Sequence, residues 1–274
     1  MFKKIAKFTV LIIVFFVMTG CFEKKSKEQS LEGFKNIKEK NVIRIAIAGR
    51  DYPPFVIDTS SDFVGFDIDL AYDIAKRMGV KAKLVKMEFD EIIPAIKKGD
   101  ADIGIATLTI TPQRNMDVLF SNPYIVSGQA LLVKNSLKNS VFSYRDLNST
   151  QYKIAYEQGT TSEGALKKYM PDSRFFPVDS SDKLYDSIIK GDTDAVIADL
   201  SFCSILMAKN KAQNFYFIDE PLTFEPFGIV VSDKNLHLLN WLNNYIQQIQ
   251  ADGAYDEFYR KWFQDTSWIK YLKK

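Results

Sequence analysis

A basic residue stands at the start of a predicted helix, where a cation is unfavourable. Residues 107–114 read TLTITPQR and follow the apolar stretch 101–106. Thr111 suits the N-cap and Pro112 the first helical position, which puts Arg114 in the first turn, at the positive end of the helix dipole. One interpretation is an ordinary capped helix whose Arg reaches solvent. The other is that an anion binds here, held by the guanidinium, the threonine hydroxyls and free backbone N–H groups.

The strand that leads to this helix belongs to an internal repeat. GDADIGIATLT at 99–109 and GDTDAVIADLS at 191–201 share Gly-Asp-x-Asp, an apolar run ending in Ile-Ala, and then a polar residue, Thr107 or Asp199. Such runs, after an amphipathic helix, indicate buried strands of β-α-β units. Ligands of open α/β sheets collect at the carboxyl ends of strands. The repeat therefore predicts two α/β lobes, with Asp199 facing Arg114 and its hydroxyls across a cleft.

Further elements flank both copies of the repeat. The C-terminal segment 238–263 has helical periodicity interrupted at Asp252-Gly253, and we expect it to pack on the first lobe through Phe258, Trp262 and Phe263. Each copy of the repeat also follows an earlier strand and helix, at 42–48 and 66–79 in the first and at 152–158 and 162–170 in the second.

The N-terminus has the features of an export signal. Three lysines precede an 11-residue run, 8–18, that is apolar except for one threonine, and Thr-Gly-Cys21 closes it. The run is shorter than the roughly 20 residues that span a bilayer, and it matches a secretory h-region. Cys21 in this setting resembles the lipidation site of bacterial lipoproteins, although Met18 replaces the usual Leu; an uncleaved anchor is the alternative. Residues 21–41 then form a polar tether that ends in a short helix.

Composition argues against most catalytic and nucleic-acid-binding classes. The net charge is only +2 over 274 residues, and no basic run indicates nucleic acid binding. One histidine, His237, and one cysteine beyond Cys21, Cys203, exclude most catalytic triads and histidine-based metal sites. We expect His237 at the surface and Cys203 buried in a helix. No phosphate-binding glycine loop is present, so we expect a binding protein without metal or cofactor.

Motifs spread over about 220 residues then point to one family. The chain resembles the extracellular solute-binding proteins of polar-amino-acid ABC importers. The resemblance is carried, in family order, by YPPF (52–55), VGFDIDLAYDIAKRMG (64–79), DEIIPAIKKGDADIGIA (90–106), TITPQR (109–114), FSNPY (120–124), EQGTTSE (157–163), GDTDAVIAD (191–199), EPFGIVV (225–231) and ADGAYDEFYRKWF (251–263).

The resemblance implies a two-lobed, type II periplasmic-binding-protein-like α/β fold. Each lobe is an α/β sandwich around a central, mostly parallel sheet, and the chain crosses twice between lobes. We expect the apolar stretches 130–136 and 226–234 to carry the crossings, since each sits beside a change of half. The expected organisation is a signal peptide over 1–20, a lipidated tether over 21–41, lobe 1 from 42–127 plus 226–274, and lobe 2 over 128–225.

The resemblance also assigns roles toward the backbone groups of an amino-acid ligand. Arg114 is similar to the family's bidentate carboxylate clamp. Thr109 and the backbone near Thr107 add hydrogen-bonding groups, and Thr161, at the start of a second-lobe helix, reaches the same carboxylate. Asp199 is the counter-charge of the ligand ammonium; its alternative role is to cap the helix that begins at the next residue.

The ligand side chain is expected to be cationic or long and polar. Tyr52 and Phe89 would wall its pocket, although aromatic residues at strand ends also occur as core. Glu157, just before the GTT loop, would pair with a cationic end group. Arg50 is expected to point outward because a buried unpaired cation is costly; turned inward, it would favour an acidic or amide side chain.

The predicted function is that of a monomeric receptor, lipid-anchored in the cell envelope, which captures a free amino acid and delivers it to the permease of an ABC importer. An enzyme on the same scaffold is the alternative, because the superfamily includes dehydratases of cyclic prephenate-like acids. Glu157 is the candidate general acid for that reaction. A sensory role is a third possibility. Asp67 and Asp69 are expected to cap and solvate a helix rather than to touch ligand.

Overall fold

The structure is a computed structural model that describes residues 33–59, 61–209, 215–218, 221–265 and 267–272. The predicted signal peptide, Cys21 and most of the tether lie outside these residues. The tether does end in a helix, over residues 33–40, and Ile37 from it is buried against the first lobe. Among the described residues, no helix combines the length and the apolar character needed to cross a membrane.

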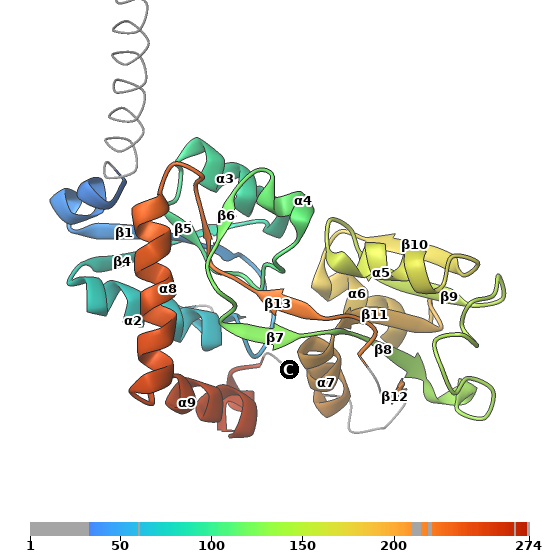
Figure 1. The fold of residues 1–274 in the computed structure, drawn as a ribbon. Helices are drawn as coiled ribbons and strands as arrows, with labels where there is room; N and C mark the ends of the chain where they lie inside the picture. The colour runs from blue at the N-terminus through green and yellow to red at the C-terminus, as the bar shows by residue number, and fades with distance from the viewer. Residues whose placement is uncertain (1–32, 60, 210–214, 219–220, 266, 273–274) are drawn as a thin grey trace, which may run out of the picture.

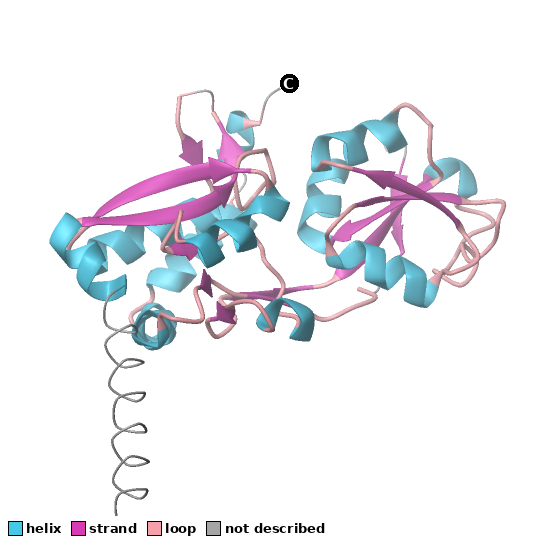
Figure 2. Ribbon diagram, turned by 90° about the horizontal axis from the view of Figure 1, so that it is seen from above, coloured by secondary structure: helices cyan, strands magenta, loops and turns pink. Residues whose placement is uncertain are grey.

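Two five-stranded sheets form the centres of two lobes, which Figures 1 and 2 show side by side. We define lobe 1 by its sheet, in which β14 runs antiparallel to both of its neighbours while β4, β1 and β5 are parallel. Its strands, in sheet order, are β4 (Lys81–Met87), β1 (Val42–Ala48), β5 (Ile103–Gly104), β14 (Val230–Val231) and β6 (Leu119–Phe120).

Lobe 2 repeats this layout. Its strands β10, β9 and β11 are parallel, and β8 is the single reversed strand. Outside the two main sheets, the short strands β2 (Ile57–Asp58) and β3 (Phe63–Val64) form a hairpin that follows β1 of lobe 1. In sheet order the strands of lobe 2 are β10 (Arg174–Val178), β9 (Lys153–Glu157), β11 (Ala195–Asp199), β8 (Gln129–Lys134) and β12 (Phe215–Ile218).

The sequence repeat explains why the two sheets correspond. Asp102, just before β5, accepts a hydrogen bond from the Arg44 backbone N–H at 2.7 Å, and Asp194, just before β11, accepts one from the Lys153 N–H at 2.8 Å. Each aspartate thus fixes the register of its strand against the neighbouring parallel strand. The two Gly-Asp-x-Asp copies perform the same structural task in both lobes.

The crossings form a two-stranded antiparallel ribbon. β7 (Ile125–Ser127) pairs with β13 (Glu225–Phe227) where the chain passes between the lobes (Figure 1). The expectation that 130–136 and 226–234 carry the crossings is therefore mostly wrong. Residues 129–134 are the reversed strand of lobe 2, and 230–231 are the reversed strand of lobe 1. Their continuous apolar character reflects burial on both faces of a sheet.

Helices cover both faces of each sheet (Figure 2). Along β1, Ile43, Ile45 and Ile47 pack with α2, α8 and the C-terminal segment, whereas Ala46 and Ala48 pack with α3, as strand alternation requires. The lobe 1 helices are α2 (Phe66–Met78), η1 (Phe89–Glu91), α3 (Ile92–Lys98), α4 (Pro112–Asn115), α8 (Leu236–Ala251), α9 (Ala254–Tyr259), η3 (Arg260–Gln264) and η4 (Ser267–Tyr271).

The predicted C-terminal helices are confirmed. The helix breaks at Asp252-Gly253, and Gly253 takes the left-handed conformation (φ 84°) that favours glycine. Trp262 is buried in the core of lobe 1, and Phe258 and Phe263 pack against that core.

The lobe 2 helices are η2 (Asn135–Leu137), α5 (Thr161–Tyr169), α6 (Ser181–Ile189) and α7 (Leu200–Lys209). Cys203 is buried in α7, and His237 is exposed, as expected.

Candidate functional site

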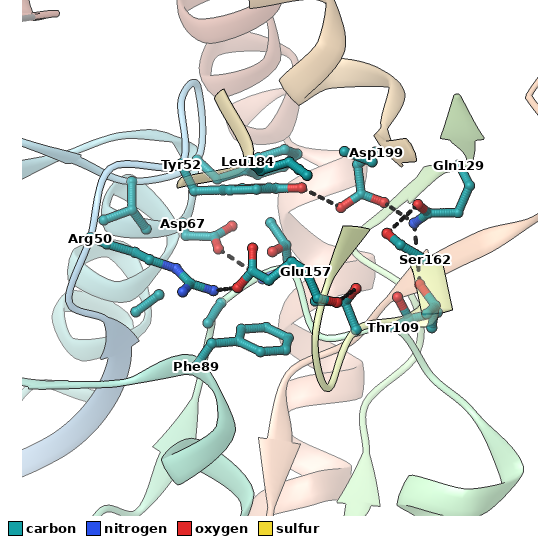
Figure 3. Close-up of a pocket in the computed structure, with 18 of the residues that line it drawn as sticks. Arg50, Tyr52, Asp67, Phe89, Thr109, Gln129, Glu157, Ser162, Leu184 and Asp199 are labelled. Atoms are coloured by element: carbon teal, nitrogen blue, oxygen red, sulfur yellow. Dashed lines mark hydrogen bonds and ion pairs between the residues drawn. The ribbon is translucent and has the colours of Figure 1, made fainter. Parts of the chain in front are cut away.

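A cleft between the lobes lies at the carboxyl ends of β1, β5, β9 and β11 (Figure 3). All eight residues predicted to bind ligand line it, five from lobe 1 and three from lobe 2. The lining residues are Ala48, Arg50, Tyr52, Phe55, Val56, Asp67, Phe89, Ala106, Thr107, Thr109, Arg114, Gln129, Glu157, Thr160, Thr161, Ser162, Leu184, Ala198 and Asp199.

Arg114 lies where the sequence predicts, in the first turn of α4. Thr111 is the N-cap and accepts a hydrogen bond from the Arg114 N–H at 3.2 Å, with Pro112 at the first helical position. The guanidinium donates to the Thr109 carbonyl at 3.0 Å and, across the cleft, to the Gly159 carbonyl at 3.3 Å. Burial lowers its pKa, an effect that the charges of Glu225 and Asp199 oppose. A half-buried cation in this position favours an anionic partner.

Thr107 has a backbone conformation that is unusual for its type. Its φ is 50°, in the left-handed region. The Thr107 N–H donates to Asp67 Oδ2 and to the Tyr124 hydroxyl oxygen, both at 3.2 Å. Because its N–H is used inside the protein, Thr107 can offer only its carbonyl and hydroxyl to a ligand. Thr109 is buried beside it and pairs with Phe227 of the crossing ribbon.

The expectation for Asp67 is wrong. Its carboxylate is completely buried and lines the cleft, and the N-cap of α2 is Gly65, without a side-chain cap. Burial raises the pKa of Asp67 to about 7, against hydrogen bonds from Tyr124 and the Thr107 backbone. Its Oδ1 atom is buried without a hydrogen-bond partner. Asp69 binds Lys261 Nζ and Trp262 Nε1, both at 2.6 Å, and so anchors the C-terminal segment to α2.

Asp199 ends β11 at the centre of a polar network (Figure 3). Its two carboxylate oxygens accept hydrogen bonds from the Tyr52 hydroxyl at 2.6 Å and from Gln129 Nε2 at 2.9 Å. Gln129 Nε2 also donates to Thr161 Oγ1 at 3.2 Å, and the Ser162 hydroxyl donates to Gln129 Oε1 at 2.6 Å. Asp199 and the four other residues of this network all line the cleft.

Burial controls the ionisation of this network. It raises the pKa of Asp199 to about 7; the charge of Glu225 adds to the increase, while Tyr52 and Arg114 oppose it. Burial and the Asp199 carboxylate also raise the pKa of the Tyr52 phenol well above its usual value. Tyr52 therefore acts as a hydrogen-bond donor, and Asp199 is poised to ionise fully when a cation approaches.

Tyr52 and Phe89 both line the cleft, and each ring also contacts another side chain of the protein. The Tyr52 ring stacks on Phe202 of lobe 2, with ring centroids 5.1 Å apart and an interplanar angle of 7°. Phe89 lies under two cations, with its centroid 5.6 Å from Arg114 Cζ and 5.9 Å from Arg50 Cζ.

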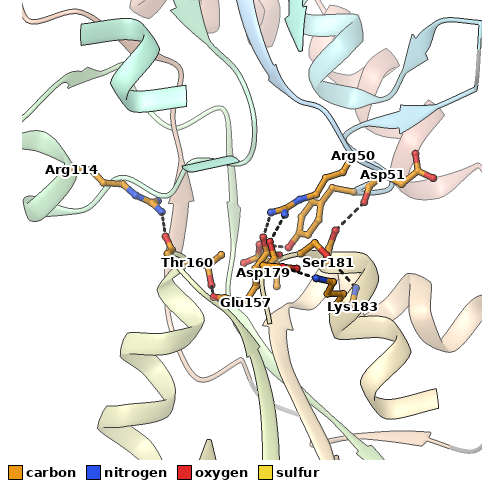
Figure 4. Close-up of polar contacts among 12 residues, drawn as sticks. Arg50, Asp51, Arg114, Glu157, Thr160, Asp179, Ser181 and Lys183 are labelled. Atoms are coloured by element: carbon orange, nitrogen blue, oxygen red, sulfur yellow. Dashed lines mark hydrogen bonds and ion pairs between the residues drawn. The ribbon is translucent and has the colours of Figure 1, made fainter. Parts of the chain in front are cut away.

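The expectation that Arg50 points outward is wrong. Its side chain is only 13% exposed, lines the cleft and forms an ion pair with Glu157 Oε1 of lobe 2 (Figures 3 and 4). The cost of burying a cation is offset here by a carboxylate from the other lobe. Burial lowers the pKa of Arg50, and the charge of Glu88 opposes this.

Hydrogen bonds join the two lobes across the cleft (Figure 4). Arg50 Nη1 donates to the Asp179 carbonyl and the Ser181 hydroxyl donates to the Asp51 carbonyl, each at 3.3 Å. With the Tyr52–Asp199 and Arg114–Gly159 bonds, these contacts hold the lobes together around the cleft. The structure therefore describes a closed arrangement.

Five polar residues of the cleft lining are not among those predicted from the sequence: Arg50, Asp67, Gln129, Thr160 and Ser162. Gln129 is the first residue of strand β8 and precedes a run of four apolar residues, and its side chain is buried. A polar residue at the start of a buried strand was the available signal. Ser162 adjoins the predicted Thr161, so the GTTSE segment pointed to it indirectly.

Taken together, the cleft can hold a zwitterion. It offers a guanidinium near hydroxyls at one place and a carboxylate ringed by donors at another, with an ion pair and an aromatic ring beyond them. Among the described residues, no group of three or more His, Cys, Asp or Glu side chains is arranged to hold a metal ion. Fold and site define a two-lobed protein that encloses a small polar ligand.

Comparison with known proteins identifies the family. Residues 43–265 match the family model of bacterial extracellular solute-binding proteins, family 3, and the chain belongs to that family. The chain is 30% identical to the ABC transporter glutamine-binding protein of Bacillus subtilis strain 168, over 95% of each chain. The predicted family is confirmed.

Solved structures confirm the predicted type II fold. A putative binding component of an ABC transporter from Wolinella succinogenes, complexed with lysine, superposes with a TM-score of 0.80 at 37% identity, covering 84% of this chain and 99% of the other. An ancestral arginine-binding protein bound to glutamine has a TM-score of 0.75 at 35% identity, covering 82% and 99%. The relatives named here are binding proteins.

Proposed function

We propose that the protein is an extracytoplasmic receptor that captures a free α-amino acid with a long polar side chain and delivers it to an ABC importer. The observation that carries the proposal is the convergence on one cleft of Arg114 from lobe 1 and Asp199 from lobe 2. These groups complement an α-carboxylate and an α-ammonium. The relatives that bind glutamine or lysine are components of ABC transporters.

Each predicted residue has a role in this proposal. Arg114 and Thr109 bind the ligand carboxylate together with the hydroxyl and N–H of Thr161, which begins α5. Asp199 and the Thr107 carbonyl bind the ammonium. Tyr52 and Phe89 flank the side chain, and Glu157 lies at its far end.

The alternative of an enzyme finds less support in the cleft. Glu157, its candidate general acid, is engaged in the ion pair with Arg50, where it accepts hydrogen bonds rather than offering a proton. A dehydratase of a cyclic acid has no need of the Asp199 carboxylate for an ammonium. The arrangement favours binding without turnover.

A thermal-shift screen against the twenty amino acids tests the proposal. A ligand at 100 times its dissociation constant adds about 2.7 kcal/mol to the free energy of unfolding. We expect stabilisation by one or a few amino acids with long polar side chains. Absence of stabilisation by any amino acid at millimolar concentration contradicts the proposed function.

We further propose that Cys21 is lipidated and anchors a monomeric receptor to the outer face of a cell membrane, with residues 22–41 as the tether. The order of lysines, apolar run and Thr-Gly-Cys supports this. Expressed in a bacterium with a labelled fatty acid, the wild type should take up label and partition into detergent, and Cys21→Ser should do neither. Equal labelling of both proteins contradicts the anchor.

A further inference from the structure

An ion pair between the lobes closes one end of the cleft. Arg50, which follows β1, and Glu157, which ends β9, are joined there, with side chains 13% and 8% exposed. Arg50 and Glu157, with Phe89, also line a second cavity on the outer side, whose other walls are Glu88, Asp90, Gln158, Asp179, Ser180 and Lys183. These three shared residues therefore form the partition between the ligand cleft and the outer cavity.

The partition carries both signs of charge. An arginine side chain is a hydrogen-bond donor only and keeps its charge even when burial lowers its pKa. A carboxylate is an acceptor only. Arg50 is also held by the Asp179 carbonyl and lies over the Phe89 ring, so its position does not depend on Glu157 alone. A ligand that reaches this end meets fixed donors on one side and fixed acceptors on the other.

We propose that the Arg50–Glu157 pair determines side-chain selectivity, and that it selects a side chain ending in an uncharged carboxamide over a cationic one. This inference rests on the proposed amino-acid receptor function and names its ligand class. A carboxamide has an acceptor oxygen for Arg50 and an NH₂ donor for Glu157. It is the end group whose two halves match the two halves of the pair.

A charged ligand side chain complements only one member of the Arg50–Glu157 pair. A ligand guanidinium or ammonium must share Glu157 with Arg50, which puts two cations side by side in a water-poor site. A ligand carboxylate can bind Arg50, but it also meets the like charge of Glu157. By itself Glu157 would favour a cationic ligand, but Arg50 already neutralises its charge.

Calorimetric titration of glutamine, glutamate, arginine and lysine tests the inference. We expect the wild type to bind glutamine at least tenfold more tightly than arginine or lysine. Arg50→Met keeps an unbranched side chain but removes the charge. It should tighten arginine and lysine binding at least tenfold, weaken glutamine binding at least threefold, and so reverse the preference.

Two further variants sharpen the test. Glu157→Gln leaves Arg50 without its anionic partner, so glutamate should gain at least tenfold relative to glutamine. Lys183→Met is the control, because it removes a positive charge from the outer cavity and Lys183 does not line the ligand cleft. It should leave the ratio of glutamine to arginine affinity within threefold of wild type.

The outcomes separate the inference from the function on which it rests. If the wild type binds none of the four amino acids and none of the remaining sixteen, the proposed function fails. If it binds arginine or lysine most tightly, the receptor function stands and the selectivity inference is overturned, even if Arg50→Met does not fold. An Arg50→Met variant that folds, by thermal melting, but changes the glutamine-to-arginine ratio less than threefold also overturns it.

Discussion

Arg50 follows β1 of lobe 1, and Glu157 ends the corresponding strand, β9, of lobe 2. One strand further along each sheet, the segment after β5 leads to Arg114 and β11 ends in Asp199. The chain at corresponding strand ends of two similarly built lobes thus leads to opposite charges, and all four residues line the same cleft. The backbone repeat supplies the symmetry, and the side chains at the strand ends break it. A zwitterionic ligand, which is itself positive at one end and negative at the other, suits a site divided in this way.

Removing the cation of lobe 1 should have the largest effect on binding. Arg114→Ala leaves a ligand carboxylate without its partner in a desolvated site, at a cost of about 2–5 kcal/mol, which is about thirtyfold or more in affinity. Calorimetry with the best amino acid from the screen measures this loss. Arg174→Ala, on the exposed edge strand of lobe 2, is the control and should bind like wild type. If Arg114→Ala binds within threefold of wild type, Arg114 does not bind the ligand carboxylate.

Removing the anion of lobe 2 should weaken binding and also change its pH dependence. The pKa of Asp199 is about 7 without ligand, whereas the ligand ammonium requires the ionised carboxylate. Affinity should therefore fall as pH decreases below 7, at least tenfold between pH 8 and pH 5.5. Asp199→Asn should bind at least tenfold more weakly than wild type at pH 8 and lose most of this dependence. A wild-type affinity that is constant over this range argues against Asp199 as the counter-charge.

Each lobe contributes one buried carboxyl to the pH dependence of stability. The pKa values of Asp67 in lobe 1 and Asp199 in lobe 2 are both raised to about 7, so between about pH 4 and pH 7 the folded state binds more protons than the unfolded state. The ligand-free protein should therefore lose stability as pH rises from 5 to 8, by at most about 1.4 kcal/mol per pH unit for each group.

Thermal unfolding of ligand-free protein measures this effect. Asp67→Asn and Asp199→Asn should each reduce the fall in midpoint temperature from pH 5 to pH 8, and the double variant should reduce it further. If neither variant changes the slope, the two carboxyls do not titrate in this range.

The smallest effect is expected at the contact between the lobes. Tyr52→Phe keeps the ring that stacks on Phe202 but removes the hydroxyl that donates to Asp199. Loss of one such hydrogen bond costs about 0.5–1.5 kcal/mol, or roughly two- to tenfold in affinity. Because this hydrogen bond lowers the pKa of Asp199, its removal should move the pH midpoint of binding upward. Titrations over a pH series measure both, and a downward movement contradicts the assignment.

Local patterns in the sequence were sufficient for much of the fold. The apolar run at 42–48 is β1, the Gly-Asp-x-Asp repeat marks β5 and β11, and Thr111-Pro112 begins α4. Each of these depends on residues that are adjacent in the chain. The same patterns predict a site whose eight residues all line the cleft. Their roles toward a ligand belong to the proposed function.

The errors concern residues whose environment comes from distant parts of the chain. Arg50 turns inward because Glu157, from the other lobe, offsets the cost of its burial. Asp67 lies in a helix with an acidic first turn, yet Thr107 and Tyr124 draw it into the interior. The stretch at 130–136 reads as apolar whether it crosses between lobes or lies within a sheet, and only the pairing of β8 with β11 and β12 decides.

The reversed strand of lobe 1 has a consequence for the order of folding. All five strands of lobe 2 come from one continuous segment, whereas β14, which separates β5 from β6 in lobe 1, follows the whole of lobe 2 in the chain. Contacts between residues so distant in sequence form slowly, because a long loop must close first. Lobe 2 can therefore complete its sheet early, whereas β6 of lobe 1 joins its sheet only after β14 has been added. A chain that emerges from export N-terminus first thus finishes the cation-bearing half of its cleft after the anion-bearing half.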